Sequence, residues 1–260
     1  MVSRNPAHSE ENPVWENHWS NLRLSGDAVT RMVRRAQATY RWQDTKQELE
    51  KTFGSIHGLK TIELGSGKGD VSLLLALEGA DVALLDANEQ SLIHARQQFA
   101  FFGLNPTVVT GDLFSLPIEI VERFQVAISW GTVEHFPRET AFRACVAHAD
   151  AVCAGGLVAI CVPNAWSLPY RLNKWYREVT GTWEWGLELP YSPLELREVG
   201  IKMGLKEIRL IGSSVVRDFD QFLFHPIMGR VEKYLGITTE RRTPFDRMFG
   251  QAITLFGEKR

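Results

Sequence analysis

Cysteine is scarce in this 260-residue sequence, and the few cysteines that occur are not closely paired. They are Cys145, Cys153 and Cys161, and no two of them form a C-x-x-C pair. An odd number of widely spaced cysteines argues against a secreted disulfide framework and against a structural zinc site. We therefore expect reduced thiols that pack as small apolar side chains.

Long apolar runs and an excess of charge of one sign are also missing. No window offers the ~20 apolar residues of a membrane-spanning helix, and the polar first dozen residues lack the apolar stretch of a signal peptide. The formal net charge is −2, which gives no general attraction to nucleic acid or to anionic lipid. We therefore expect a cytoplasmic protein that contacts neither a membrane nor nucleic acid.

Short apolar runs alternate with helical patterns through much of the chain. The expected strands are "LKTIEL", "DVALLD", "TVVTGD", "QVAISW", "GLVAICVPN", "KEIRLIGSS" and "QAITLFGEK". The first five are apolar on both faces and mostly separated by helices, which predicts a parallel sheet covered on two sides; the last two add an antiparallel edge. The expected fold class is α/β, with a Rossmann-like, doubly wound sheet of seven strands, mostly parallel with a C-terminal antiparallel strand.

The chain has no internal repeat and no low-complexity linker, so a single domain over residues 1–260 is expected. Within it, "DAVTRMVRRAQATYRW" predicts one amphipathic helix whose arginines form a solvated face. The predicted parts are an N-terminal helical cap (1–55), a ligand-binding core (56–165), an aromatic-rich insertion (166–191) and a C-terminal part of the sheet (192–260) with an excursion over 213–249.

Three glycines stand at every second position in "TIELGSGKGD", where the first strand meets a helix. Gly65, Gly67 and Gly69 permit positive φ and close approach of a ligand to the backbone, and the helix start attracts polar or anionic groups. The spacing is G-x-G-x-G and not the G-x-G-x-x-G of dinucleotide folds. By itself the turn does not select a ligand.

Two carboxylates limit which ligand can bind at this turn. Glu63 lies inside the first apolar strand, where an ionised side chain is costly without a partner. It would repel a pyrophosphate and attract an ammonium group. Asp86 ends the second strand, where an acidic side chain can accept both hydroxyls of a ribose. A ligand with a ribose and a cationic amino-acid tail fits both, and S-adenosylmethionine has this combination.

Five motifs in register support that ligand. In order they are "ELGSGKGD", "LLDANEQSLIHAR", "TGDLFSLP", "AISWGTVEHF" and "GGLVAICVPN". Over about residues 55 to 165 the sequence resembles the class I S-adenosylmethionine-dependent methyltransferases. The resemblance implies an enzyme that uses S-adenosylmethionine, releases S-adenosylhomocysteine and needs no metal.

The resemblance also implies which residues hold the cofactor. Glu63 matches the acid before the glycine turn, and Gly65, Ser66 and Gly67 match the turn that binds the methionine amino and carboxylate groups; whether Lys68 also holds that carboxylate is open. Asp86 matches the ribose-binding acid. The remaining positions are Ala87, Asn88, Asp112 and Leu113 beside the adenine, and Ser129 and Trp130 on the methionine side.

Methyl transfer requires alignment of nucleophile, methyl carbon and sulfur, and a general base only if the nucleophile arrives protonated. His135 and Glu134, just after the fourth strand, are the candidate catalytic residues, although a His at this place in the family is commonly a helix-end or loop anchor without a catalytic role. His18, His94 and His148 are expected on helix surfaces.

The insertion at 166–191 holds a concentration of aromatic residues that predicts a lid over the methyl acceptor, or a locally packed helical hairpin. The expected pocket residues are Trp166, Tyr170, Trp175, Trp183 and Trp185. The 213–249 excursion either completes this pocket or forms the face of a homodimer.

We expect transfer to an oxygen, nitrogen or carbon of a small-molecule metabolite, aromatic ones included. The alternatives are an RNA or protein methyltransferase and a non-catalytic S-adenosylmethionine-binding subunit. The N/D-P-P-Y type of loop that acts on base amines is absent after the fourth strand, and intact acidic and glycine positions oppose a lost site.

Overall fold

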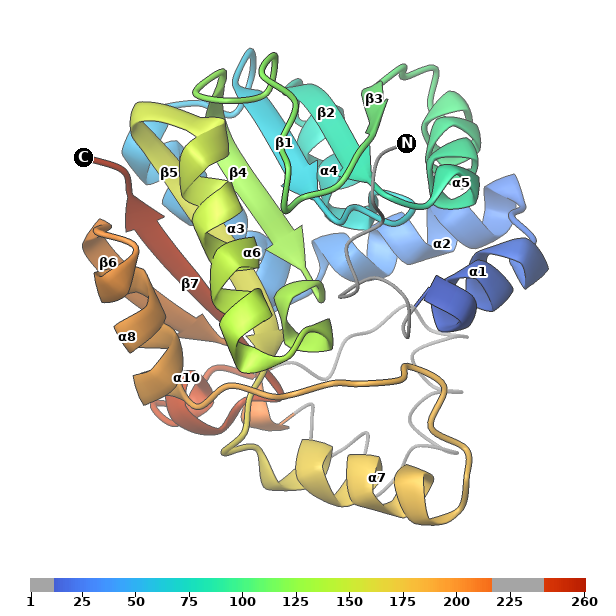
Figure 1. Cartoon of the computed structure of the whole chain (residues 1–260), viewed down its shortest axis with the longest axis vertical. Helices are drawn as coiled ribbons and strands as arrows, with labels where there is room; N and C mark the ends of the chain where they lie inside the picture. The colour runs from blue at the N-terminus through green and yellow to red at the C-terminus, as the bar shows by residue number, and fades with distance from the viewer. Residues whose placement is uncertain (1–11, 217–240) are drawn as a thin grey trace.

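The computed structural model describes residues 12–216 and 241–260 (Figure 1). Residues 217–240 of the predicted 213–249 excursion, and the first eleven residues of the predicted cap, lie outside the described residues. Among the described helices, none has the length and apolar character that a membrane crossing requires.

The described residues form one sheet of seven strands in the order β3-β2-β1-β4-β5-β7-β6 (Figure 1). Among the seven described strands, β7 runs antiparallel to both of its neighbours, β5 and β6, and the other six share one direction. This confirms the predicted fold class. The strands are β1 (Lys60–Leu64), β2 (Asp81–Asp86), β3 (Thr107–Thr110), β4 (Phe124–Trp130), β5 (Val152–Pro163), β6 (Lys206–Gly212) and β7 (Ala252–Glu258).

Helices cover both faces of the sheet, because the strands are apolar on both sides. One buried cluster joins the sheet to α6 and α8 through Ala144, Leu196 and Leu255. The other joins it to α3, α4 and α5 through Leu49, Leu73 and Phe99. The helices are α3 (Tyr40–Phe53), α4 (Asp70–Leu77), α5 (Glu89–Ala100), α6 (Arg138–Ala151) and α8 (Pro193–Lys202).

Local sequence signals set several helix ends. Ser192 and Glu195 form the expected capping box at the start of α8. The Asn88 side chain caps α5 by accepting a hydrogen bond from the Ser91 amide. These caps place the loops at the carboxyl ends of the strands, where a ligand would bind in this class of fold.

The predicted single helix over residues 27–42 is wrong, since the structure breaks it into α2 (Gly26–Gln37) and α3. The Thr39 hydroxyl accepts a hydrogen bond from the Trp42 amide and so caps α3. The break lets Trp42 turn into the core, where its side chain is buried. A third helix, α1 (Asn12–Asn21), precedes these two and contacts α5.

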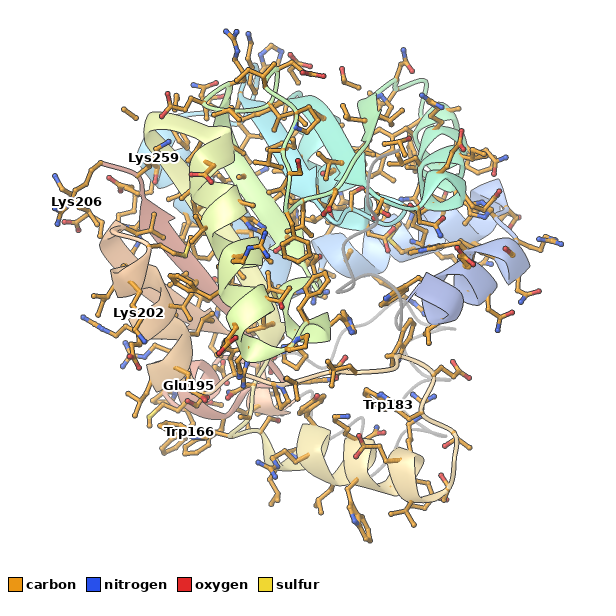
Figure 2. The ribbon with its side chains drawn as sticks, in the orientation of Figure 1. Trp166, Trp183, Glu195, Lys202, Lys206 and Lys259 are labelled. Atoms are coloured by element: carbon orange, nitrogen blue, oxygen red, sulfur yellow. The ribbon has the colours of Figure 1, made fainter. Side chains whose placement is uncertain are left out.

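The chain leaves the sheet after β5 and forms α7 (Leu168–Val179), which projects below the sheet edge in Figure 1. It returns along an extended segment, residues 180–192, which we call the strap. Trp166 and Trp183 lie at the two ends of α7 (Figure 2). Two short elements complete the described chain: the 3-10 turn η2 (Val133–His135) after β4, and α10 (Asp246–Phe249) before β7.

The packing of β7 allows a test of the fold. Leu255 is fully buried against α8, whereas Ile201 on α8 is 58% exposed. We expect Leu255→Ala to lower the free energy of unfolding by about 2–5 kcal/mol, because it leaves a cavity in the core. Ile201→Ala, the control, should change it by less than about 0.5 kcal/mol. Urea unfolding followed by circular dichroism measures both, and equal effects would contradict the described packing.

Candidate functional site

A large cleft opens at the carboxyl ends of the parallel strands, with a volume of about 1970 Å³. Its walls come from the ends of β1, β2 and β4, from α1 and α2, and from the strap and α7. Most of the sequence-predicted site residues line it. They are Glu63, Gly65, Ser66, Gly67, Asp86, Ala87, Asn88, Asp112, Leu113, Trp130, Glu134, His135, Tyr170, Trp183 and Trp185.

The glycine turn after β1 has no room for side chains. Gly65 has φ +62°, and a Cβ there would lie 2.3 Å from Cγ2 of Thr132. Gly67 has φ +52°, and a Cβ there would lie 2.8 Å from the Trp19 ring. The Thr132 hydroxyl donates to the carbonyl oxygens of Leu64 and Gly65, at 3.3 and 3.1 Å. The turn is therefore packed between α1 and the segment after β4.

Asp86 fastens this turn to the next strand. Its carboxylate accepts hydrogen bonds from the backbone amides of Gly67, at 2.7 Å, and Asn88, at 2.8 Å. Burial raises the pKa of Asp86, and these two amide donors oppose the rise. The sequence reasoning assigned Asp86 to a ribose and missed this structural role. Each carboxylate oxygen retains a second lone pair for a ligand hydroxyl.

Glu63 is buried at the base of the cleft, with only 4% of its surface exposed. Its carboxylate accepts one hydrogen bond, from the Ser72 amide at 3.2 Å. Burial raises the pKa of Glu63 to about 8; Ser72 opposes the rise, Asp70 adds to it and Lys68 opposes it. Because Lys68 forms an ion pair with Asp70, Glu63 has no cation of its own among the described residues.

The adenine-side positions predicted from the sequence lie together at the ends of β2 and β3. Asp112 accepts a hydrogen bond from the Phe114 amide at 2.8 Å, so it also stabilises its own turn. Leu113 is buried and Asn88 caps α5 as described. These residues form a mixed apolar and polar wall on one side of the cleft.

Trp130 ends β4 and faces the cleft, and the Arg41 guanidinium lies 4.1 Å from its ring centroid. Arg31 and Arg35 of α2 also line the cleft. Arg31, Arg34 and Arg35 are exposed, as expected for a solvated face, whereas Arg41 is half-buried beside Trp130. Ser129, predicted beside the cofactor, is fully buried and does not line the cleft, since side chains alternate along the strand.

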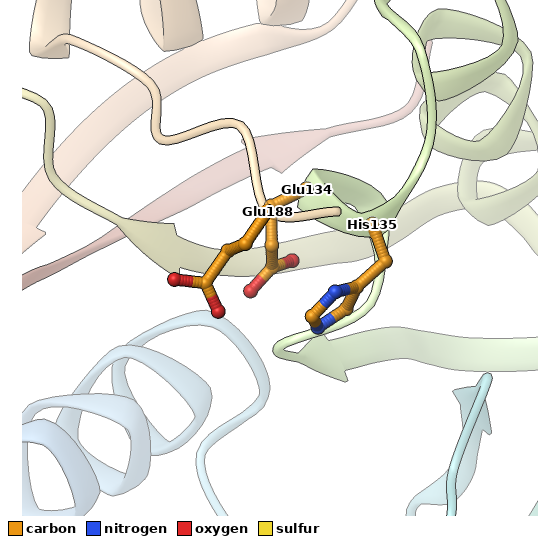
Figure 3. Close-up of side chains that lie close together, drawn as sticks. All are labelled: Glu134, His135 and Glu188. Atoms are coloured by element: carbon orange, nitrogen blue, oxygen red, sulfur yellow. The ribbon is translucent and has the colours of Figure 1, made fainter. Parts of the chain in front are cut away.

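One end of the cleft is lined by η2 and the strap, and we call it the far end. Three polar side chains converge there: Glu134, His135 and Glu188 (Figure 3). One ligand-type atom from each lies within 4.8 Å of the others. Burial raises the pKa of Glu134 to about 8, raises that of Glu188 and lowers that of His135. Glu188 was missed by the sequence reasoning, and the only available signal was an acidic residue within an aromatic segment.

The strap is held against η2 by its backbone and by Arg138. The Leu189 amide donates to the Glu134 carbonyl oxygen at 2.8 Å. Arg138 donates to the Pro190 carbonyl oxygen at 2.7 Å, and its guanidinium lies 3.8 Å from the Tyr191 ring centroid. These contacts bring Glu188 beside two residues that lie more than fifty positions earlier in the chain.

Helix α1 covers this end of the cleft. The Trp15 ring lies 5.0 Å from the His135 ring and 5.9 Å from the Trp185 ring. His94 Nε2 donates to the Trp19 carbonyl oxygen at 2.8 Å, which ties α1 to α5. The predicted surface positions of His94 and His148 are therefore wrong, since both side chains are buried. His18 is half-buried against Trp185.

Two predicted pocket residues lie elsewhere. Trp166 packs on Phe249, with ring centroids 6.5 Å apart, and lines a separate small groove. Trp175 is 62% exposed on α7. Neither lines the cleft. The sequence alone could not distinguish these two residues from Tyr170, Trp183 and Trp185. The paths of α7 and the strap decide which aromatic rings face the cleft.

Comparison with known families decides the enzyme class. Residues 62–156 match the family model described as a methyltransferase domain. The chain carries a methyltransferase domain. A sequence comparison with curated proteins found no match.

Solved structures share the fold of this methyltransferase at low sequence identity. An S-adenosylmethionine-dependent methyltransferase from Thermotoga maritima, described as a possible histamine N-methyltransferase, is 16% identical with a TM-score of 0.60, over 95% of this chain and 100% of that one. Magnesium protoporphyrin IX methyltransferase from Synechocystis, with bound S-adenosylhomocysteine, is 16% identical with a TM-score of 0.57, over 97% and 95%. Phosphoethanolamine N-methyltransferase 2 from Haemonchus contortus, in complex with S-adenosylmethionine, is 14% identical with a TM-score of 0.61, over 94% and 60%.

The domain match and the shared fold together confirm the enzyme class predicted from the sequence, an S-adenosylmethionine-dependent methyltransferase. The matched segment of this methyltransferase runs from within β1 to the start of β5 and contains all of β2, β3 and β4. The cap, α7 and the strap, which shape the far end of the cleft, lie outside that segment.

The contact between Gly65 and Thr132 gives a test of the glycine turn in this methyltransferase. We expect Gly65→Ala to destabilise the protein by at least about 1–2 kcal/mol, from the positive φ alone, with the Thr132 methyl clash in addition. Thr132→Ser removes that methyl and keeps the hydroxyl, so the double variant should be more stable than the sum of the two single losses predicts. Urea unfolding of the four proteins measures this coupling, and strict additivity would contradict the contact.

Proposed function

We propose that this methyltransferase transfers a methyl group from S-adenosylmethionine to an oxygen, nitrogen or carbon of a small-molecule acceptor held at the far end of the cleft. The size and lining of the cleft carry the proposal. Its volume of about 1970 Å³ is roughly twice the upper range of ~1,000 Å³ typical of a pocket for one drug-sized ligand. The cleft thus has room for the cofactor and for a second small molecule.

The end of the cleft at the glycine turn, which we call the near end, suits the cofactor. Glu63 is a buried carboxylate with no cation of its own among residues 12–216 and 241–260, so it would attract the methionine ammonium group. The turn at Gly65, Ser66 and Gly67 allows close backbone approach. Asp86 would receive the ribose hydroxyls. Ala87, Asn88, Asp112 and Leu113 would surround the adenine, and Trp130 would lie on the methionine side.

The far end of the cleft suits a small acceptor with a flat or apolar part. Trp15, Trp183, Trp185 and Tyr170 supply large apolar surfaces there. The Lys174 ammonium lies 4.2 Å from the Trp183 ring centroid and lines the same end. Helix α1 and the strap cover this end, which favours a metabolite over a folded macromolecule.

In the reaction the acceptor atom attacks the methyl carbon in line with the breaking carbon–sulfur bond. The bond electrons pass to sulfur, which loses its positive charge. Alignment of the reacting atoms in the cleft can lower the activation barrier by roughly 7–11 kcal/mol. A hydroxyl or ammonium acceptor must also lose a proton, and Glu134 and His135, the predicted catalytic residues, are polar groups at the far end.

The solved structures agree with this substrate class by their descriptions. Those named above are described as a possible histamine N-methyltransferase, a magnesium protoporphyrin IX methyltransferase and a phosphoethanolamine N-methyltransferase, and each of these named acceptors is a small molecule. At 14–16% identity they establish the fold, and the acceptor of this chain is inferred from its own cleft.

The buried carboxylate of Glu63 predicts that cofactor affinity depends on pH. Without ligand, Glu63 is protonated below its raised pKa of about 8, and the ligand ammonium favours the ionised form. Binding of S-adenosylhomocysteine below pH 8 must therefore release a proton, and affinity should fall by up to about tenfold per unit as the pH falls from 8 to 6.

Isothermal titration calorimetry in buffers of different ionisation enthalpy measures both the affinity and the released proton. Glu63→Gln keeps an acceptor for the Ser72 amide and should remove this pH dependence. Comparison of the two proteins cancels contributions from other groups such as Asp86. An equal pH dependence in both proteins would show that Glu63 does not face the ligand.

The acceptor class is tested with S-adenosylmethionine labelled in its methyl group. We expect the label to enter the small-molecule fraction of a cell extract, and not its RNA or protein fraction. Trp185→Ala should reduce this transfer at least about tenfold while S-adenosylhomocysteine binding is kept, because Trp185 lines only the far end. Trp175→Ala, an exposed tryptophan of the same excursion, is the control. Label in RNA or protein would contradict the proposal.

A further inference from the structure

We propose that Glu134, His135 and Glu188 form a binding site for one divalent transition-metal ion, of the zinc, cobalt or manganese type, at the far end of the cleft. The site goes beyond the methyl-transfer proposal, which needs no metal, and adds a ligand that the sequence reasoning did not assign. Two carboxylates and an imidazole are ligand types that such ions accept.

The three side chains converge from two separate segments (Figure 3). Glu134 and His135 lie on η2, and Glu188 lies on the strap. One ligand-type atom from each lies within 4.8 Å of the others, so a modest side-chain movement brings all three around one ion. Three protein ligands with an open side toward a cleft is the arrangement of catalytic metal sites.

The hydrogen bond of His135 fixes which ring nitrogen faces the other two residues. Nδ1 lies 2.7 Å from the Leu187 carbonyl oxygen, which can only accept, so Nδ1 carries the proton. In the neutral ring Nε2 is then unprotonated and can bind an ion through its lone pair. Metal-binding histidines usually donate their other ring nitrogen to a carbonyl or carboxylate in this way.

Glu134 supplies an independent observation that points to a ligand. Only 1% of its surface is exposed, and Oε2 has no hydrogen-bond partner within the described parts of the chain. A buried carboxylate oxygen without a partner is costly, whereas a bound cation would satisfy it. Glu134 lines the cleft, and one of its carboxylate oxygens lies within 4.8 Å of ligand-type atoms of His135 and Glu188.

Glu188 is held in place by a neighbour. The Tyr170 hydroxyl donates a hydrogen bond to Oε1 of Glu188, which leaves Oε2 for an ion. The backbone hydrogen bond from Leu189 to the Glu134 carbonyl oxygen joins the two segments directly beside the cluster. Such supporting hydrogen bonds orient metal ligands and tune their affinity.

The positive side chains nearby are engaged with other groups. Lys174 pairs with Glu178 and lies over the Trp183 ring. Arg138 donates to carbonyl oxygens of the strap and lies over Tyr191. Within residues 12–216 and 241–260, neither Glu134 nor Glu188 forms an ion pair. Lys174 is close enough to act on Glu188 electrostatically but pairs with Glu178, so neither carboxylate is bound directly by a cation of the described chain. A bound ion with an open position would hold the acceptor heteroatom and favour loss of its proton.

The test uses the full chain without an affinity tag, treated with chelator and titrated with Co²⁺ or Zn²⁺ alone. We expect one equivalent to bind, with visible absorption bands for bound Co²⁺. Glu188→Gln and Glu134→Gln should each weaken binding at least about tenfold and remove the bands. Tyr170→Phe keeps all three ligands and should weaken binding by about 10–100-fold. Glu184→Gln, on the exposed part of the strap, is the matched control and should bind as the wild type does.

Circular dichroism and the melting temperature of each variant without metal show whether it is folded. If Glu134→Gln fails to fold, Glu188→Gln and Tyr170→Phe still decide the question. Absence of saturable binding, or equal binding by the wild type and Glu188→Gln, would overturn the proposal. Since cofactor and acceptor are absent from the titration, that result would leave the methyl-transfer proposal intact.

Discussion

The site depends on a carboxylate, Glu63, which is buried inside β1, an interior strand of the sheet, and has no cation of its own among the described residues. Its neighbours in register are the apolar Leu84 and Ile128, and among the described residues its carboxylate accepts a hydrogen bond from the Ser72 amide. Such a group is unfavourable in an empty cleft and favourable beside an ammonium group. The strand thus carries a binding preference at the cost of some stability, which is a common arrangement at functional sites.

Hydrogen bonds between the ends of neighbouring strands shape the rest of the cleft around that carboxylate. Asp86 binds the glycine turn to β2, and the Thr132 hydroxyl binds it to the segment after β4. The segment continues into η2, so Glu134 and His135 lie at a fixed distance from the turn. The strap then adds Glu188. The cofactor end and the acceptor end are therefore parts of one connected structure.

The sequence predicted the sheet and the cofactor end because both depend on local signals. Apolar runs, glycine spacing and strand-end acids are readable along the chain, and the structure brings Glu63, Gly67 and Asp86 together as expected. The break at Thr39 was missed because the apolar stripe continues across it. Glu188, Trp166 and Trp175 were missed or misplaced because their positions depend on the path of the strap and α7, which is set by tertiary contacts such as those of Arg138.

A crystal structure of the methyltransferase with S-adenosylhomocysteine tests the central claim most directly. The account predicts the amino-acid tail of the ligand at Glu63 and the glycine turn, the ribose hydroxyls at Asp86, and the sulfur directed toward the space bounded by Trp15, Glu134 and Trp185. A ligand bound in the reverse orientation, or bound away from Glu63, would contradict it.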